Sequence, residues 1–149
     1  MGYPYSTQTV VVTGITTTAY AANQVMGTGV QVMPSTPYGG FIQTVQINLN
    51  STNANQIDVC YFTSSMPNTT FTNGSSIAVS SADFAAQGPV VSVTTWNYMG
   101  TTASNGLASG LAYAMPTVNT TPMYFALVAR GAVTVNSSLG VSVATTFVS

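Results

Sequence analysis

Apolar and polar residues alternate along several short segments of the chain. The clearest cases are 45–50, which reads Val-Gln-Ile-Asn-Leu-Asn, and 139–147 near the end of the sequence. Successive side chains of a β-strand point to opposite faces, so this alternation predicts strands with one buried face. No segment of useful length shows the 3.6-residue period of an amphipathic helix. The pattern predicts an all-β protein, with these side chains in its core: Val45, Ile47, Leu49, Val141, Val143 and Phe147.

Further strands are predicted at four other places. Residues 9–12 form an apolar run near the start, and 91–95 alternate Val with hydroxyl residues. Residues 57–62 predict a strand with Ile57, Val59 and Tyr61 on one face and Asp58, Cys60 and Phe62 on the other. The run 123–129 is apolar on both faces, which is typical of a central strand that is covered on both sides.

The segments between the strands carry turn signals. We expect a hairpin in which 133–135 face 139–141 across a turn at 136–138. Residues 80–84 are expected to cap one short helical turn, because Ser is a favoured N-cap residue. Residues 100–110 are small and polar, and we interpret them as a mobile loop.

These elements add up to about eight to ten short antiparallel strands. Their spacing is typical of a single-domain β-sandwich or jelly roll, and 149 residues suit one domain. We expect residues 1–15 to hold an N-terminal arm and the first strand, and residues 16–149 to form the sandwich.

Charge is nearly absent from the chain. It has one Arg, two Asp and no His, and charged residues make up 2 % of it, against about 25 % in an average soluble domain. Without a basic patch, nucleic acid is not an expected partner. Without His or paired carboxylates, we expect no catalytic residues, no metal site, no cofactor and no enzyme activity. No run approaches the roughly 18 apolar residues of a membrane span, so no membrane partner is expected.

Three groups of residues are candidates for a defined role. Asp58 and Arg130 can form an ion pair between two strands, and we favour a structural role for it over a partner-facing one, because a buried charge must be paired. Tyr3, Pro4 and Tyr5 precede the first strand. They are either a frayed terminus or an arm that docks on a neighbouring molecule.

A third group lies at the end of a predicted strand. Trp96, Tyr98 and Met99 lead into the 100–110 segment. Packing in the core is the usual role of such a cluster, and the alternative is a loop rim that binds protein or carbohydrate. A surface rich in Ser and Thr, with little net charge to keep molecules apart, also favours a protein that works in an assembly.

Three segments, in this order, resemble a group of tailed-bacteriophage structural proteins. In residues 16–34, Thr17, Tyr20 and Gly27 match the opening motif of that group, whereas its acidic positions fall on Thr16 and Gln24. The other segments are 68–74 followed by 80–84, and 126–131 followed by 136–139 and a closing alternating strand.

The resemblance implies a capsid decoration, or cement, protein with a β-sandwich or jelly-roll fold. Such proteins lie on the outer surface of the virion capsid, so the implied partners are the major capsid protein and further copies of the chain in a homotrimer. The mechanism expected of this class is the clamping of neighbouring capsomers. The alternative is a host- or glycan-binding β-sandwich module, such as part of a head fibre or an adhesin-like protein.

Overall fold

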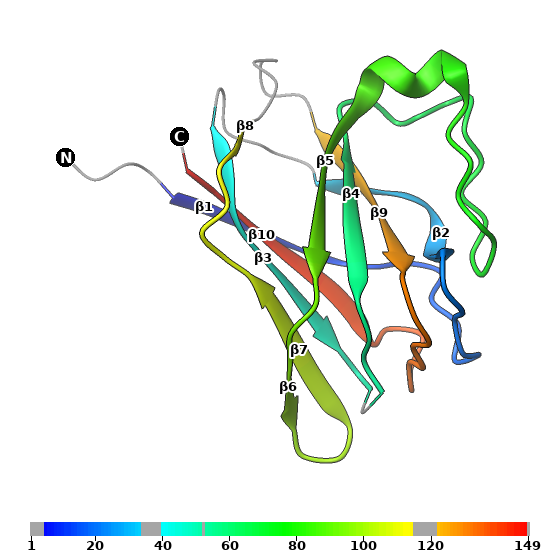
Figure 1. The fold of residues 1–149 in the computed structure, drawn as a ribbon, viewed down its shortest axis with the longest axis vertical. Helices are drawn as coiled ribbons and strands as arrows, with labels where there is room; N and C mark the ends of the chain where they lie inside the picture. The colour runs from blue at the N-terminus through cyan, green and yellow to red at the C-terminus, as the bar shows by residue number, and fades with distance from the viewer. Residues whose placement is uncertain (1–4, 34–39, 52, 115–121, 149) are drawn as a thin grey trace.

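The protein is a single-domain β-sandwich of two antiparallel sheets (Figure 1). The computed structural model describes residues 5–33, 40–51, 53–114 and 122–148. These residues form ten strands and one short 3-10 helix, namely β1 (Tyr5–Val11), β2 (Gln24–Met33), β3 (Phe41–Leu49), β4 (Ile57–Phe62), η1 (Ser81–Ala86), β5 (Gln87–Val93), β6 (Trp96–Met99), β7 (Ala103–Ala108), β8 (Tyr113–Ala114), β9 (Met123–Ala129) and β10 (Val141–Val148). The all-β prediction is confirmed, and Ser80 caps η1 through its side chain as expected.

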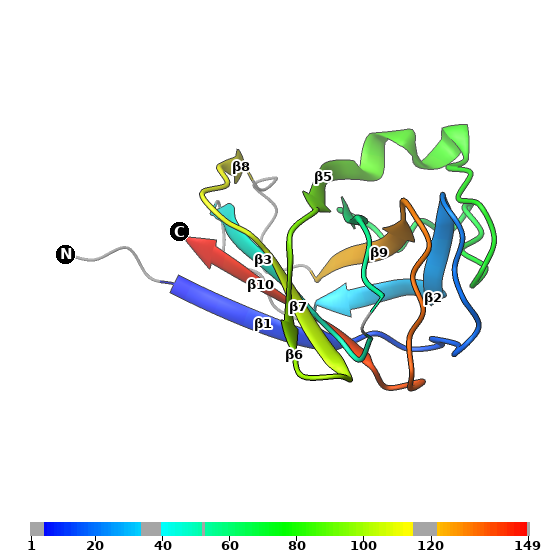
Figure 2. The ribbon, with the colours of Figure 1, turned by 60° about the horizontal axis from the view of Figure 1, so that its bottom comes forward.

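Strand pairing is nested along the chain. Strand β1 pairs with β10, β2 with β9, β3 with β7, and β4 with β5. The result is a six-stranded sheet of order β1-β10-β3-β7-β6, with β8 beside β3, and a four-stranded sheet of order β2-β9-β4-β5. A long antiparallel ribbon that rolls up in this way is a jelly roll. Figure 2 shows the two layers from a second direction.

The main core lies between the two sheets. All six residues that the alternation places in the core are buried there. From the four-stranded sheet, alternate residues of β4 and β9 meet them, for example Tyr61 and Phe125, whose ring centroids are 6.3 Å apart. The hydroxyl of Tyr61 forms a 2.8 Å hydrogen bond with that of Thr145, so these two buried hydroxyls satisfy each other.

The outer side of the four-stranded sheet carries a second, smaller core. Residues 63–86, which connect β4 to β5, fold over this side and bury Met66 and Phe71 against Cys60, Phe62 and neighbouring strand residues. Strand β9, and β4 apart from Asp58, carry apolar residues on both faces, since both faces are covered. The expectation of a central strand at 123–129 is confirmed, since β9 lies between β2 and β4.

The interpretation of residues 100–110 as a loop is wrong, because β7 lies within them. Its inward-facing residues are small, and Gly106 lies beneath Val93 and Trp96. A Cβ atom at Gly106 would come within 2.4 Å of Val93 Cγ1 and 3.0 Å of Trp96 Cε3. The large side chains of neighbouring strands fill the core above β7, so β7 shows no apolar alternation of its own.

The predicted hairpin between 133–135 and 139–141 is also wrong. Val133 forms an antiparallel bridge with Tyr20, and the amide of Asn136 donates to the carbonyl of Asn50. Leu139 lies in a turn with 77 % of its surface exposed. The chain passes from one sheet to the other here, because β9 and β10 belong to different sheets.

The first strand is an integral part of the sandwich. All seven residues of β1 pair with β10, from Tyr5 opposite Val148 to Val11 opposite Ser142. Val12 and Ile15, which follow β1, are buried in the main core. The described part of the predicted 1–15 segment therefore starts with β1.

The face assignment of β10 can be tested with two neighbouring substitutions. Val143 is fully buried, whereas Ala144 lies on the outer side of the same strand. We expect Val143→Asp to lower the free energy of unfolding by several kcal/mol and to abolish folding, because it buries an unpaired charge. Ala144→Asp is the matched control and should change stability by less than about 1 kcal/mol. Far-UV circular dichroism with urea titration measures both, and a folded Val143→Asp protein would contradict the assignment.

Candidate interaction surface

The outer side of the six-stranded sheet is left uncovered by the described residues. We call this surface the open face. None of its side chains is fully buried, in contrast to the outer side of the four-stranded sheet. Its members are Tyr5, Thr7, Thr9 and Val11 of β1, Ser142, Ala144, Thr146 and Val148 of β10, Phe41, Thr44, Gln46 and Asn48 of β3, Ala103, Asn105 and Leu107 of β7, and Asn97 and Met99 of β6.

Polar groups on the open face bond sideways to one another. Gln46 donates to Asn48 Oδ1 at 2.8 Å, and Asn48 Nδ2 donates to the Ser142 hydroxyl at 3.3 Å. The hydroxyls of Thr7 and Thr146 are 2.9 Å apart. Asn48, Asn105 and Asn97 stand opposite one another on three adjacent strands. The face is thus covered by amides and hydroxyls, interrupted by apolar side chains.

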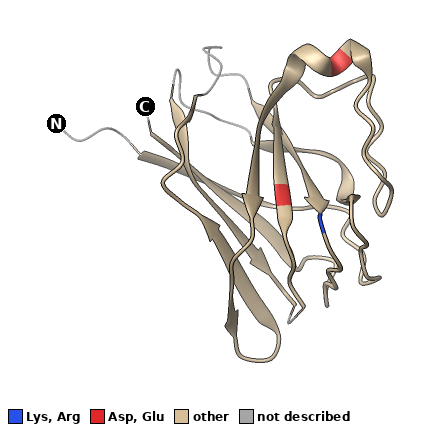
Figure 3. Cartoon of the chain, viewed as in Figure 1, with Lys and Arg blue, Asp and Glu red and all other residues tan. Residues whose placement is uncertain are grey.

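The charged residues of the chain all lie on the other side of the molecule. Asp58 is in β4, Arg130 directly follows β9, and Asp83 is in η1, which belongs to the segment covering the four-stranded sheet (Figure 3). The six-stranded sheet contains no charged residue at all. A partner of the open face therefore meets no charged side chain from these strands.

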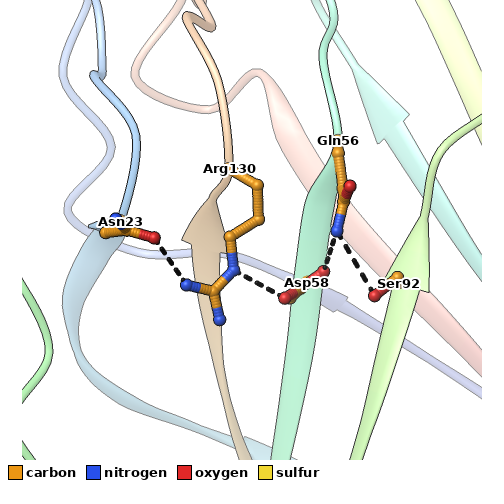
Figure 4. Close-up of polar contacts among 5 residues, drawn as sticks. All are labelled: Asn23, Gln56, Asp58, Ser92 and Arg130. Atoms are coloured by element: carbon orange, nitrogen blue, oxygen red, sulfur yellow. Dashed lines mark hydrogen bonds and ion pairs between the residues drawn. The ribbon is translucent and has the colours of Figure 1, made fainter.

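Asp58 and Arg130 form an ion pair on the outer side of the four-stranded sheet. Arg130 Nε donates to Asp58 Oδ2 at 2.6 Å, and Arg130 Nη1 donates to Asn23 Oδ1 at 2.7 Å (Figure 4). Gln56 Nε2 donates to Asp58 Oδ1 at 3.0 Å and reaches the Ser92 hydroxyl at 3.4 Å. In the order β2, β9, β4, β5, these contacts link all four strands of the sheet.

The two members of this pair differ in their access to solvent. The Asp58 side chain is 7 % exposed and the Arg130 side chain 33 % exposed. Burial acts to raise the pKa of Asp58, but hydrogen bonds from Gln56, Arg130 and Ser92, together with the Arg130 charge, outweigh it and hold the pKa below its ordinary value. The carboxylate is therefore ionised and fully engaged within the sheet.

Asp83 anchors the segment that covers the four-stranded sheet. Its carboxylate accepts hydrogen bonds from the Asn68 amide N–H and side chain, both at 3.0 Å, and from the Thr69 hydroxyl at 2.7 Å. Burial opposes ionisation here too, yet these hydrogen bonds lower the pKa of Asp83 below its ordinary value. This geometry joins η1 to the turn after Met66.

The candidate rim residues do not lie together on one surface. Trp96 is half-buried over Gly106, on the inner side of the sheet, and packs against the main core. Tyr98 stands opposite Ser104 on that same side, whereas Met99 stands opposite Ala103 on the open face. Of the candidate arm, Tyr5 is 65 % exposed on the open face, and Tyr3 and Pro4 lie outside the described residues.

A shallow groove of about 330 Å³ lies at one end of the open face. Its walls include the amides of Asn48 and Asn50, the hydroxyl residue Thr102, and the exposed apolar side chains of Met99 and Leu139. It thus combines hydrogen-bonding groups with apolar surface.

The sequence did not reveal a second polar cluster, around Asn73. Asn73 Oδ1 accepts hydrogen bonds from the Tyr20 hydroxyl at 2.7 Å and from the Gly27 amide at 2.8 Å. Gly27 has φ +96°, and a Cβ atom there would lie 2.7 Å from the Thr13 carbonyl oxygen. The cluster pins the tip of the covering segment to β2, and it joins residues about 50 positions apart, which local patterns do not connect.

Within the described ranges, no three His, Cys, Asp or Glu side chains are grouped so that they could hold a metal ion. Among these residues, no helix is long and apolar enough to cross a membrane. Comparison of the chain with protein-family models, with curated proteins and with solved structures finds no match.

A double-mutant cycle tests the role of the ion pair. Arg130→Ala leaves the Asp58 carboxylate buried without its cation, so we expect a loss of about 2 kcal/mol in unfolding free energy. Asp58→Ala leaves Arg130, which can turn toward water, and should cost about 1 kcal/mol. The double variant should be no less stable than Arg130→Ala alone. Urea denaturation measures all four proteins, and strictly additive losses would show that the two residues act independently.

The lowered pKa values of Asp58 and Asp83 also predict that the stability of the fold depends on pH. Because both groups have a lower pKa when folded than when unfolded, their stabilisation is complete above the ordinary Asp pKa of about 3.9. It is lost as the pH falls through the lower folded values. We expect the melting temperature to stay level from about pH 8 to pH 5 and to fall below about pH 4. Asp58→Asn should flatten that fall, and an equally steep fall in this variant would contradict the assignment to Asp58.

Proposed function

We propose that this protein is a virion structural protein, namely a capsid decoration (cement) protein on the outer surface of a phage head. The observation that carries the proposal is the open face, a broad uncharged sheet surface on a jelly-roll domain. Jelly rolls are common among viral capsid and lectin domains, although a fold alone does not define a function. The sequence resemblance to phage head proteins adds the location and the expected homotrimer.

The mechanism follows from the chemistry of the open face. Tyr5, Phe41 and Leu107 offer exposed apolar area, and the surrounding hydroxyls and amides can bond to a polar backbone or side chain. Binding of this kind depends on apolar burial and neutral hydrogen bonds. The protein would clamp neighbouring capsomers by covering the surface of the major capsid protein on both sides of a joint.

Salt provides the test that is specific to this mechanism. Few counterions are released or screened at an uncharged interface, so binding to particles should hardly change with sodium chloride. Sulfate should strengthen the apolar part of the contact. We expect the protein to remain on purified particles in fixed copy number through a sodium chloride series. Release of folded protein by moderate sodium chloride would contradict the proposed interface.

Matched substitutions separate the open face from the rest of the surface in the same experiment. Leu107→Lys places a charge on the open face, and Phe84→Lys places one on η1, where the native side chain is similarly exposed (50 % and 56 %). An unpaired charge in a buried contact costs several kcal/mol, so Leu107→Lys should weaken particle binding by at least about tenfold. Phe84→Lys should bind like the unmodified protein.

The groove at the end of the open face supports a second candidate function. Amides and hydroxyls beside Met99 and Leu139 are groups that can hold a carbohydrate, as expected for a host- or glycan-binding module. A protein of that kind would be present in few copies per particle and would bind cells or sugars in isolation. Loss of this binding in Asn48→Ala, without loss from particles, would favour the glycan-binding candidate over the decoration protein.

A further inference from the structure

Strand β1 is an unprotected edge of the sandwich. An edge strand exposes unpaired backbone groups, and proteins usually guard it with a charge, a proline, a bulge or a short strand. The other edge strands described here are guarded. Strands β6 and β8 have four and two residues, β2 has a break in register between Met26 and Gln31, and β5 contains Pro89.

Strand β1 carries none of these devices. It is seven residues long, has no charge and no proline, and pairs with β10 in an unbroken register. Within the described residues, β10 is its only strand partner. Among these residues, no strand pairs with the other edge of β1.

The direction of the free backbone groups follows from the ladder. The Val12 amide donates to the Val141 carbonyl at 2.9 Å. Hydrogen-bonded pairs alternate along an antiparallel ladder, so the even-numbered residues of β1 bond to β10. The N–H and C=O groups of Tyr5, Thr7, Thr9 and Val11 then point to the open edge.

We propose that the β1 strands of two copies of this chain pair antiparallel across a two-fold axis at Gln8. This register uses all seven residues. It places Tyr5 opposite Val11 and Thr7 opposite Thr9 of the second copy, so that the residues with outward-pointing backbone groups face one another. Aromatic to β-branched pairs and Thr–Thr pairs are favourable cross-strand neighbours.

Charge and symmetry favour a second copy of this chain as the partner that pairs with β1. The six-stranded sheet has no charged residue, so a charged partner strand would lose hydration without gaining an ion pair. A second β1 brings the same uncharged Tyr, Thr and Val side chains. An interface across a two-fold axis must be self-complementary, and the sequence of β1 meets this condition when it is reversed about Gln8.

This inference does not depend on the proposed function. If the chain forms the expected homotrimer through another surface, β1 pairing joins two trimers, and if it does not, β1 pairing gives a dimer. In both cases the loss of β1 pairing halves the mass in solution. Particle binding is a separate measurement, so a failure of one proposal is visible without the other.

The first experiment measures mass by sedimentation at micromolar concentration. The double variant Thr7→Lys/Thr9→Lys places like charges opposite each other across the proposed contact, and we expect it to sediment with half the mass of the unmodified protein. Thr44→Lys is the control, because it adds a lysine to the same face two strands away and should leave the mass unchanged. An unmodified protein that sediments as a monomer, or as a trimer that the double variant leaves intact, would overturn the proposal.

The second experiment remains decisive if the lysine variant fails to fold. Residues facing each other in a non-hydrogen-bonded antiparallel pair lie at a distance that suits a disulfide. Gln8→Cys should therefore form a covalent dimer on mild oxidation, and a reductant should reverse it. Thr44→Cys is the control, and the native Cys60 is buried and adds no background. Equal cross-linking of both variants, or none of Gln8→Cys, would overturn the proposed pairing.

Discussion

Strand β9, and β4 apart from Asp58, carry apolar residues on both faces, and such strands are stable only when both faces are covered. The six-stranded sheet covers one face, and residues 63–86 cover the other. That covering segment needs an internal anchor, which Asp83 supplies through hydrogen bonds to Asn68 and Thr69. Arg130 and Asp58 tie the four strands beneath it. All the charge of the chain is therefore engaged on one side of the molecule.

The six-stranded sheet has no charged side chain. Its polar groups are amides and hydroxyls that bond to their neighbours on the sheet, as Gln46 and Asn48 do. A surface of this kind neither repels a second copy nor attracts ions. The open face and the outer edge of β1 thus share the same lack of charged side chains, which supports the proposed contacts with other molecules.

Much of the fold was predictable because its signals are local. Alternation at 45–50 and 139–147 follows the two-residue period of a strand, and the apolar run at 123–129 is typical of a strand with two covered faces. The Asp58–Arg130 pair could be named since few other charges are available. Strand β7 was not predicted because its inward-facing residues are small. Gly106 lies beneath Val93 and Trp96, so the apolar side chains at this place in the core come from other strands.

The sequence by itself determined the all-β class, the buried face of each alternating strand and the scarcity of charged residues. Only the tertiary structure decided which strands are neighbours, which sheet is covered and which edge is free. Val133 packs beside Tyr20, and Asn73 bonds to Gly27, across long stretches of chain. Side-chain periodicity defines the face of a strand, but strand pairing depends on the burial and hydrogen bonding of the whole chain, which no local pattern contains.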